Sequence, residues 1–364
     1  MQLEGKLYKI AIIGLGLIGG SLAKAIKKKS PNSFIAAFDK NDVIDLAIKE
    51  KTIDFALNDY KDAKDYDIIF LCLPIDLSLY YFENLIPIIS SNTILTDVCG
   101  VKYPFHILWE VKAKAGYYIG GHPMTGKEKG GYSNSDPLLF ENSVYILCKS
   151  KNSNNEIINK ISELLKLTGA RFRFLDAKLH DRVVAFVSHL PQLLAVSLVN
   201  NLPTDDHNIN FLDFAAGGFR DMTRIASSSF DIWESIFKYN KDEIHYALQS
   251  LQNILNETDN ELLNSELYNI GKKFLSAAIK RDSIPKNNKG FISPIYDILV
   301  YVKDEPGVIS KISTALFDKN INIKDIELLK IREGDGGTFR LAFESLEDAE
   351  LAKEILTNIG YKVN

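Results

Sequence analysis

A glycine-rich turn near the N-terminus constrains the fold of this chain more than any other feature. A short apolar run, Lys9–Ile13, leads into the turn, and a helical stretch over residues 21–29 follows it. The turn matches the pattern GxGxxG and consists of Gly14, Leu15, Gly16, Leu17, Ile18 and Gly19. The first glycine permits a tight turn, the second lets the backbone approach a pyrophosphate, and the third lets the helix pack on the strand. The pattern predicts a dinucleotide-binding turn, although glycine-rich turns alone occur in many unrelated proteins.

An acidic residue follows at the distance expected for ribose recognition. Pro31 and Asn32 end the helix, Phe34–Phe38 is typical of a second strand, and Asp39 stands at its end. An acid about 20 residues past the turn hydrogen-bonds the ribose hydroxyls of NAD and would repel the additional phosphate of NADP. The alternative role of Asp39 is that of a helix cap or turn residue. Together the two motifs predict NAD as the cofactor.

Two further apolar runs extend the pattern. The stretch 67–73 ends at Pro74, the stretch 93–98 follows, and helical segments separate them. Strands that alternate with helices predict an α/β fold class, with a doubly wound, Rossmann-type dinucleotide-binding domain over residues 1–170. Such sheets bind their ligand at the carboxyl ends of the strands, so Leu73 and Pro74 are expected cofactor contacts.

Composition limits the remaining possibilities. The chain has 364 residues, and at about 150 residues per domain this length predicts two or three domains. The 43 basic and 47 acidic residues give a formal charge of −4, which disfavours nucleic acid and anionic membranes as partners. The histidines and cysteines include neither an HxxxH nor a CxxC pair, so no metal site is expected. No apolar run reaches the roughly 18 residues of a membrane span.

The cysteines indicate the compartment. Cys72, Cys99 and Cys148 are few, odd in number and far apart, which is typical of the reducing cytosol rather than of a secreted disulfide framework. The apolar stretch 10–23 follows two lysines and resembles a short secretory signal, but the glycine turn accounts for it better. The sequence therefore predicts a cytoplasmic protein.

A second, all-α domain is expected over residues 171–285. The pattern over residues 177–200 is helical with Pro191 inside it, which predicts a kink. His180 and His189 are nine residues apart and would face opposite sides of a straight helix. Two apolar stripes at heptad-like spacing follow, and such stripes usually form core. They are Ile244, Leu248, Leu251 and Leu255, then Leu263, Leu267, Ile270 and Phe274.

A histidine lies among small residues in the first domain. His122 follows the strand-like stretch 117–119 and stands within Gly120–Gly126, so we expect it in a loop. Loops at strand ends often carry catalytic groups, yet many loop histidines only satisfy backbone hydrogen bonds. Spacing alone leaves both interpretations open.

Three sequence blocks together resemble the prephenate and arogenate dehydrogenases. The first, Gly121–Gly131, has the pattern Gly-His-Pro-Met-x-Gly-x-Glu-x-x-Gly. The second joins His180-Asp181 to the stretch 188–191 (SHLP), and the third is 217–225 (GGFRDMTRI) with Trp233 beyond it. With the glycine turn, these blocks recur in the family's order and at similar spacing. The resemblance covers the first two domains.

This resemblance implies a reaction and a set of site residues. The family oxidatively decarboxylates prephenate, or its amino analogue arogenate, on the route to tyrosine, with NAD(P) as hydride acceptor, and forms dimers. His122 would polarise the 4-hydroxyl of the ring, because an imidazole with an ordinary pKa near 6.5 holds a proton acceptor at neutral pH. Arg224 would hold a substrate carboxylate in its planar fork. The remaining substrate-side residues would be His189, Gln192, Arg220 and Trp233.

Arg220 and Arg224 are also informative by spacing. Four residues apart on a helix, they share a face and repel each other unless an anion lies between them. This spacing makes a pocket for a dicarboxylate plausible, and a solvated charged face is the alternative.

Two positions depart from the family pattern. Gln192 stands where the family usually has a second histidine that reaches the substrate side chain, which leaves the choice between prephenate and arogenate open. Gly100 stands where the family commonly has serine, so a hydrogen bond to the 4-hydroxyl or the nicotinamide has to come from elsewhere. Cys99 is a weak substitute for that hydroxyl.

The last segment is expected to form a third domain over residues 296–364, after a linker at 286–295 rich in Lys and Asn. Its pattern β-α-β-β-α with a short final strand predicts a ferredoxin-like βαββαβ unit, with a hairpin turn at 334–337.

This segment resembles the ACT domains, which are amino-acid-sensing modules. The resemblance lies in Asp304–Val308 and in Asn320–Ile323. It implies that Gly307 and Asn322 lie at a ligand site between two copies and that tyrosine is the effector. A simple turn is the alternative role of Gly307.

The leading hypothesis is therefore an NAD-dependent prephenate dehydrogenase that is cytoplasmic, forms a homodimer and is regulated by tyrosine. Arogenate or dual-specificity cyclohexadienyl dehydrogenase is the alternative within the family. A 3-hydroxy-acid dehydrogenase is disfavoured, because those enzymes generally rely on a lysine and asparagine pair. A non-catalytic sensor of NAD and an amino acid is disfavoured by the joint presence of His122, Arg224 and the glycine turn.

Overall fold

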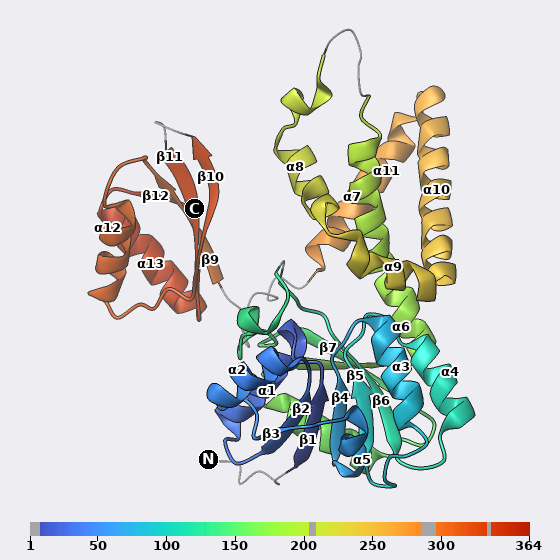
Figure 1. Cartoon of the computed structure of the whole chain (residues 1–364). Helices are drawn as coiled ribbons and strands as arrows, with labels where there is room; N and C mark the ends of the chain where they lie inside the picture. The colour runs from blue at the N-terminus through green and yellow to red at the C-terminus, as the bar shows by residue number, and fades with distance from the viewer. Residues whose placement is uncertain (1–7, 128, 204–208, 285–295, 333–335) are drawn as a thin grey trace. The chain divides into compact units, whose positions relative to one another are not determined.

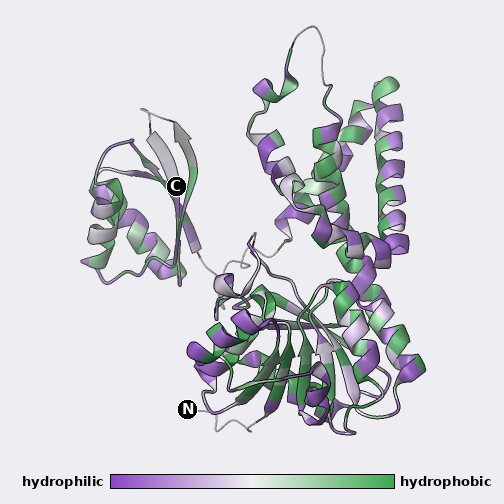
Figure 2. Ribbon diagram, viewed as in Figure 1, coloured by the Kyte–Doolittle hydropathy of each residue, from purple (hydrophilic) through white to green (hydrophobic). Residues whose placement is uncertain are grey.

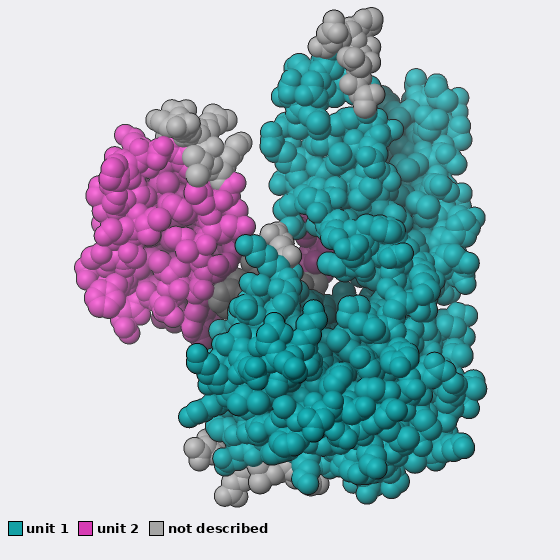
Figure 3. All heavy atoms as spheres, viewed as in Figure 1, with its two compact units in different colours: residues 1–279 teal, residues 280–364 magenta. Residues whose placement is uncertain are grey.

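The protein is described from a computed structural model. The residues that the structure describes are 8–127, 129–203, 209–284, 296–332 and 336–364. They belong to two compact units, residues 1–279 and 280–364 (Figure 3). The expected linker at 286–295 lies outside the described residues, as does the first half of the expected hairpin turn.

The first unit begins with an eight-stranded sheet of order β3-β2-β1-β4-β5-β6-β7-β8, flanked by helices on both faces (Figure 1). The strands are β1 (Lys9–Ile13), β2 (Phe34–Phe38), β3 (Phe55–Ala56), β4 (Ile68–Leu71), β5 (Ile94–Asp97), β6 (Tyr117–Pro123), β7 (Val144–Lys149) and β8 (Arg171–Leu175). The helices are α1 (Leu17–Lys29), α2 (Asn41–Lys49), α3 (Ile75–Leu85), α4 (Tyr103–Lys112) and α5 (Asn155–Lys166). The predicted doubly wound α/β architecture is confirmed.

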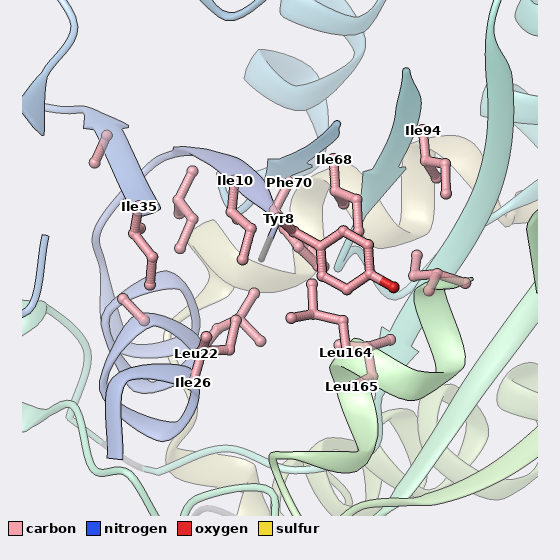
Figure 4. Packing of buried hydrophobic residues seen from close by; sticks show 14 of the residues in the cluster. Tyr8, Ile10, Leu22, Ile26, Ile35, Ile68, Phe70, Ile94, Leu164 and Leu165 are labelled. Atoms are coloured by element: carbon pink, nitrogen blue, oxygen red, sulfur yellow. The ribbon is translucent and has the colours of Figure 1, made fainter. Parts of the chain in front are cut away.

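Both faces of the sheet are buried, which explains why its strands are apolar at nearly every position. Along β1, Ile10 and Ile12 point into a core beneath α1, α2 and α5, whereas Ala11 and Ile13 point into a second core beneath α3 and α4. Figure 4 shows the first core, in which Ile10 packs near Leu22 and Leu164. In the hydropathy colouring, the strands are correspondingly apolar (Figure 2).

The sheet differs from expectation at β6 and β7. The strand expected to end at residue 119 continues to Pro123, so His122 lies on β6 and not in a loop. Glycine is needed here for close packing: a Cβ at Gly121 would lie 2.5 Å from the carbonyl oxygen of Asp97. In addition, β7 pairs antiparallel with β6, so the sheet is not wholly parallel.

The rest of the first unit is helical, as predicted. Its helices are α6 (Ala177–Val184), α7 (Leu190–Asn200), α8 (Gly217–Thr223), α9 (Phe230–Tyr239), α10 (Lys241–Leu263) and α11 (Leu267–Asp282). A small core of Ala185, Leu190, Ile244 and Ala247 holds the start of α7 and the turn before it against α10. Short 3₁₀ turns lie at Phe211–Phe214 and Arg224–Ser227.

A π-helical turn joins α6 to α7. It spans Ala185–His189 and is followed directly by α7, whose first turn contains Pro191. A π turn adds residues per turn, so it changes the phase of everything that follows it. The helix is therefore not regular over residues 177–200, and the buried His180 and His189 both join the hydrogen-bond network of Asp181 and Asn240.

The two predicted stripes have different environments. Ile244 is buried and Leu248 and Leu251 pack against the small helical core, but Leu255 is exposed. The second stripe is interrupted, since α10 ends at Leu263 and α11 begins at Leu267. Three of its members are exposed, including Leu263 at 76% and Phe274 at 75%. The sequence left open whether the partner of these stripes is the same chain, and the second stripe does not form core within this one chain.

One helical stretch is both long and apolar. The continuous stretch Ala177–Asn200 is long and apolar enough to cross a membrane by length and composition. The core helices of globular proteins meet the same criteria, and this helix carries buried polar groups that hydrogen-bond to other elements, among them His180, Asp181 and Gln192.

The second unit contains a four-stranded antiparallel sheet of order β10-β11-β9-β12 with two helices on one face (Figure 1). Its elements are β9 (Tyr296–Val302), α12 (Val308–Phe317), β10 (Asp325–Arg332), β11 (Gly336–Phe343), α13 (Leu346–Asn358) and β12 (Lys362–Val363). The order confirms the predicted βαββαβ unit. Gly307 adopts φ +88° immediately before α12, a conformation that favours glycine.

Candidate active site

The glycine turn between β1 and α1 has the geometry of a phosphate cradle. At Gly14, with φ +98°, a Cβ would lie 2.6 Å from the carbonyl oxygen of Cys72, and at Gly19 it would lie 2.0 Å from that of Gly14. At Gly16 a Cβ would meet nothing within 4 Å, which leaves open space beside the backbone. Helix α1 begins at Leu17, four residues earlier than expected, so its N-terminus lies inside the turn. These residues fit a bound pyrophosphate.

Asp39 closes the same turn. Its carboxylate accepts hydrogen bonds from the backbone N–H groups of Leu15 and Lys40, which holds the end of β2 against the turn. Leu73 contacts the position of Gly14, and Pro74 caps α3 at the end of the neighbouring strand. These predicted cofactor residues therefore lie together at the carboxyl ends of β1, β2 and β4.

His122 belongs to a chain of three hydrogen-bonded side chains. Its Nδ1 lies 2.8 Å from Nε2 of His180, and Nδ1 of His180 lies 2.7 Å from Oδ1 of Asp181. His122 comes from β6, whereas His180 and Asp181 come from the first turns of α6. Nε2 of His122 makes no hydrogen bond with a described residue and lies on the side of Gly100, where a Cβ would be 3.8 Å away.

Asp181 is held in place by the start of another helix. Its Oδ1 accepts from the backbone N–H of Lys102 at 2.7 Å, and its Oδ2 accepts from that of Tyr103 at 2.8 Å. These N–H groups belong to the N-terminus of α4, where a carboxylate is favoured. Asp181 therefore joins the helical domain to the dinucleotide domain at the site.

Burial determines the protonation states of these three side chains. Burial lowers the pKa of His122 well below its ordinary value, and the neighbouring His180 and Lys102 lower it further. Burial, followed by Lys102, lowers the pKa of His180 to about 3. Burial raises the pKa of Asp181 to about 6 against the opposing backbone hydrogen bonds. At neutral pH, both imidazoles are neutral and Asp181 is ionised.

A buried ion pair supports the segment that carries Gly100. Lys102 and Asp97 are both 0% exposed and pair with each other. Asp97 also accepts from the hydroxyl of Tyr118 at 2.7 Å and from the backbone N–H of Cys99 at 2.8 Å. The ion pair connects the first and last residues of the segment 97–102 and so fixes the path of this segment past His122.

A second histidine lies in the same polar network. The side-chain amide of Asn240 donates to the carbonyl oxygen of Asp181 at 2.8 Å and lies 3.2 Å from Nδ1 of His189. Since the amide nitrogen is the donor, Nδ1 of His189 accepts and its Nε2 carries the proton. The ring lies edge-on to Trp233, with centroids 6.0 Å apart. Burial lowers the pKa of His189 to about 4, so it is a neutral donor at pH 7.

The remaining predicted substrate residues lie around the 3₁₀ turn that begins at Arg224. Gln192 is buried and donates from Nε2 to the carbonyl oxygen of Ile225 at 3.0 Å, so its amide holds this turn. Arg224 is exposed and forms no ion pair with a described residue. Arg220 donates from Nε to the carbonyl oxygen of Ala215, and α8 ends before Arg224. The two arginines therefore do not share a regular helix face.

Several polar residues of the site were not singled out from the sequence. From the sequence, His180 is characterised only by its spacing from His189 and by a family block that it shares with Asp181, and Asp97, Lys102 and Asn240 have no predicted role. A signal existed for Lys102, which is a lysine in an otherwise apolar segment after a buried strand. No local pattern indicates Asn240, because its partners lie 51 and 59 residues earlier. Within the described ranges, no cluster of three or more His, Cys, Asp or Glu side chains could hold a metal ion.

Comparison with known proteins places all three segments. Residues 22–174 match the model of the prephenate dehydrogenase nucleotide-binding domain, residues 176–274 that of the prephenate dehydrogenase dimerization domain, and residues 296–360 that of the ACT domain. Prephenate dehydrogenase of Bacillus subtilis is 33% identical over 95% of each chain. That of Lactococcus lactis is 34% identical over 96% of this chain and 97% of the relative.

A solved structure agrees with this comparison. Prephenate dehydrogenase from Aquifex aeolicus, in complex with hydroxyphenyl propionate and NAD+, superimposes with a TM-score of 0.70 at 26% identity. The match covers 78% of this chain and all of that one. With its glycine turn, its His122 site and its C-terminal ACT domain, this chain belongs to the prephenate dehydrogenase family of NAD-dependent oxidoreductases.

Proposed function

We propose that the protein converts prephenate to 4-hydroxyphenylpyruvate by NAD-dependent oxidative decarboxylation in tyrosine biosynthesis. The observation that carries this proposal is the state of His122: a neutral imidazole with Nδ1 engaged and Nε2 open beside Gly100. Such a group accepts the proton of an alcohol as that alcohol is oxidised. NAD, when bound at the glycine turn, supplies the hydride acceptor.

The reaction balances with the groups present. The hydride leaves C4 of the ring, the 4-hydroxyl proton goes to His122, and the bond between C1 and its carboxylate breaks to release carbon dioxide as the ring becomes aromatic. His122 then returns the proton to the ring oxygen, which gives the phenol of the product, so no proton is released overall. His122 is therefore needed as an acceptor, and its lowered pKa keeps it unprotonated at neutral pH. His189, with its proton on Nε2, is placed to donate to a substrate oxygen.

Arg224 is the residue we assign to a substrate carboxylate. Its guanidinium is unpaired among the described residues, and the turn that carries it is held by Gln192. Arg224→Ala should raise KM for prephenate about tenfold or more with a smaller change in kcat, because a charge-assisted hydrogen bond contributes about 1.5–3 kcal/mol. Steady-state kinetics would measure KM and kcat, with Arg173→Ala, at an exposed position on β8, as the control. An unchanged KM would assign the carboxylate to another residue.

The preference for prephenate over arogenate depends on Gln192. Its amide is engaged with Ile225 and carries no charge, so it offers neither a cation to a keto acid nor an anion to an amino acid. The decisive experiment is a pair of assays for reduced nicotinamide, one with prephenate and one with arogenate, each with NAD and NADP. We expect turnover with prephenate and NAD. Turnover with arogenate alone would favour the alternative, and turnover with neither would favour a sensor.

We infer a homodimer that forms through the helical domain. The exposed apolar side chains on α10 and α11 support it, since stripes of this kind mark protein interfaces. They are Leu262, Leu263, Leu267, Phe274, Leu275 and Ile279. The double variant Leu267→Glu/Phe274→Glu should convert a dimer to a monomer in sedimentation analysis, because each carboxylate would be desolvated at the interface. Gln252→Glu serves as a control, and a dimer that survives the double variant would place the interface elsewhere.

We infer tyrosine as the ligand of the C-terminal domain. A cavity of about 280 Å³ lies against Gly307 and is lined also by Asp304, Leu328 and Phe339, while Asn322 is exposed and lies outside that lining. Tyrosine should inhibit turnover and raise Tm, and truncation after residue 295 should abolish inhibition with activity retained. Inhibition that persists in the truncated enzyme would place the tyrosine site in the first 295 residues.

We also infer the functional segments and the compartment. A dinucleotide-binding domain at 1–170, a substrate and dimerisation domain at 171–285 and a regulatory domain at 296–364 agree with the ranges matched by the three family models. A cytoplasmic location is supported by the three cysteines, which are all free thiols.

A further inference from the structure

The hydrogen bonds from Asp181 to His122 determine where each proton of the chain lies. When ionised, the Asp181 carboxylate can only accept, so Nδ1 of His180 must donate to it. A neutral imidazole carries one proton, so Nε2 of His180 is then an acceptor. Nδ1 of His122 must therefore donate to it, which leaves Nε2 of His122 with a lone pair towards Gly100. This is the tautomer that oxidation of an alcohol requires.

We propose that His122, His180 and Asp181 form a proton relay that ends on Asp181, with His180 and Asp181 as positioning residues for the reaction. The inference rests on the proposed function and adds where the substrate proton is held until it returns to the ring oxygen. Nε2 of His122 takes the hydroxyl proton, Nδ1 of His122 passes its proton to Nε2 of His180, and Nδ1 of His180 passes its proton to Oδ1 of Asp181. One bond to hydrogen breaks and one forms at each step, and both imidazoles end neutral. After decarboxylation the same steps run in reverse and return the proton to the phenolate oxygen, which gives the phenol of the product and leaves Asp181 ionised.

The energetic reason for a relay is the cost of a buried imidazolium. The pKa of His180 is lowered to about 3 by burial, whereas that of Asp181 is raised to about 6. Among these three hydrogen-bonded side chains, the carboxylate therefore holds a proton more tightly than either imidazole ring does. The substrate proton would leave a cation in the interior if it stopped at His122, and it leaves no net charge on the chain if it reaches Asp181.

Other charged groups around these three side chains act in both directions, because Lys102 lowers the pKa of both histidines and of Asp181, whereas Asp97 raises the pKa of His180. Helix α4 contributes Lys102 and His106, β5 contributes Asp97, and the π turn contributes His189. Lys102 opposes a positive charge on His122 and on His180. Cys148 on β7 faces Asp181 as a thiol, because burial raises its pKa to about 12. The remaining neighbours, Arg182 and Glu243, pair with each other at 2.8 Å.

The relay predicts an acid limb that belongs to Asp181. Below pH about 6, Asp181 takes a proton from solvent and becomes a donor to Nδ1 of His180. Each ring then changes tautomer, and Nε2 of His122 carries a proton that blocks acceptance from the substrate. The value of kcat/KM should fall tenfold per pH unit below this point, although neither imidazole is charged.

Asp181→Asn tests the relay by kinetics. The amide keeps the size, and its one oxygen can still accept from the backbone N–H of Lys102, with loss of the hydrogen bond from Tyr103. It cannot take a proton. We expect kcat to fall about 10–100-fold, the acid limb near pH 6 to disappear, and the affinity for NAD to stay unchanged. His180→Gln should give a similar loss, and the double variant should lose little more, because both changes break one chain. Loss of activity by an equal factor at every pH would indicate a merely structural role and overturn the relay.

A spectroscopic measurement tests the same inference without turnover. In ¹⁵N-histidine-labelled enzyme, His122 should carry its proton on Nδ1 at pH 8 and on Nε2 at pH 5, and the change should be absent in Asp181→Asn. His245→Asn, an exposed position on α10, assists assignment and should not alter the His122 signals. A proton on Nε2 at both pH values would overturn the relay even if prephenate is oxidised. The expected tautomers without oxidation of prephenate would instead refute the proposed function and leave the relay standing. The measurement on the wild-type enzyme tests the relay even if Asp181→Asn fails to fold.

Discussion

Replacing His122 with asparagine should lower kcat by about 10²–10⁴-fold while leaving the affinity for NAD unchanged. An asparagine can occupy the position on β6 and hydrogen-bond to His180, but it cannot accept a proton from the substrate. The predicted NAD site lies at the ends of β1, β2 and β4, so the substitution should not disturb it. Steady-state kinetics and a fluorescence titration with reduced cofactor would measure the two effects separately.

The matched control for this variant is His245→Asn. His245 is exposed on α10, and this substitution should leave both kcat and cofactor affinity within a factor of about two. Near-normal turnover in His122→Asn would contradict the role of His122 as proton acceptor. A parallel loss of cofactor affinity would point instead to a distorted dinucleotide domain.

Replacing Lys102 with methionine should destabilise the first unit by about 3–5 kcal/mol, because it leaves Asp97 buried without its cation. The Asp97 carboxylate would keep the hydrogen bonds from Tyr118 and from the backbone of Cys99, but it would have to remain charged in an apolar interior or take a proton. Urea unfolding followed by circular dichroism would measure the free energy of unfolding. Removing both partners in Asp97→Asn/Lys102→Met should cost less than removing the lysine alone.

Lys112 provides the control on the same helix. It pairs with Glu83 at the surface, where both side chains are more than 40% exposed. Solvent screens such a pair, so Lys112→Met should change the free energy of unfolding by less than about 1 kcal/mol. If Lys102→Met and Lys112→Met had equal effects, the buried pair would contribute no more than a surface pair does.

The elements of the dinucleotide and ACT domains were largely predictable from the sequence. Lys9–Ile13 and Phe34–Phe38 were expected as strands and have those bounds in the structure. The signal in each case is local, because a strand that is buried on both faces must be apolar throughout. Helix ends were less accurate, as α1 shows by beginning inside the glycine turn at Leu17.

Features that depend on packing were not predictable in the same way. His122 looked like a loop residue because glycine and proline surround it, yet the glycines are there to let β6 approach Asp97 and Lys102. The stripe that includes Leu263 and Phe274 looked like core, but it is exposed on a single chain. Periodicity shows that a face is apolar and does not show which surface covers it.

By itself the sequence determined the glycine turn, the order of strands and helices, and the family to which the chain belongs. These features arise from steric and hydrophobic rules that act over a few consecutive residues. Only the tertiary structure decided how His122, His180, Asp181 and Lys102 meet. His122 and His180 are 58 positions apart, and Lys102 and Asp181 are 79 apart. Hydrogen bonds act over about 3 Å, so the direction of a proton through these groups depends on how the sheet, α4 and α6 pack together.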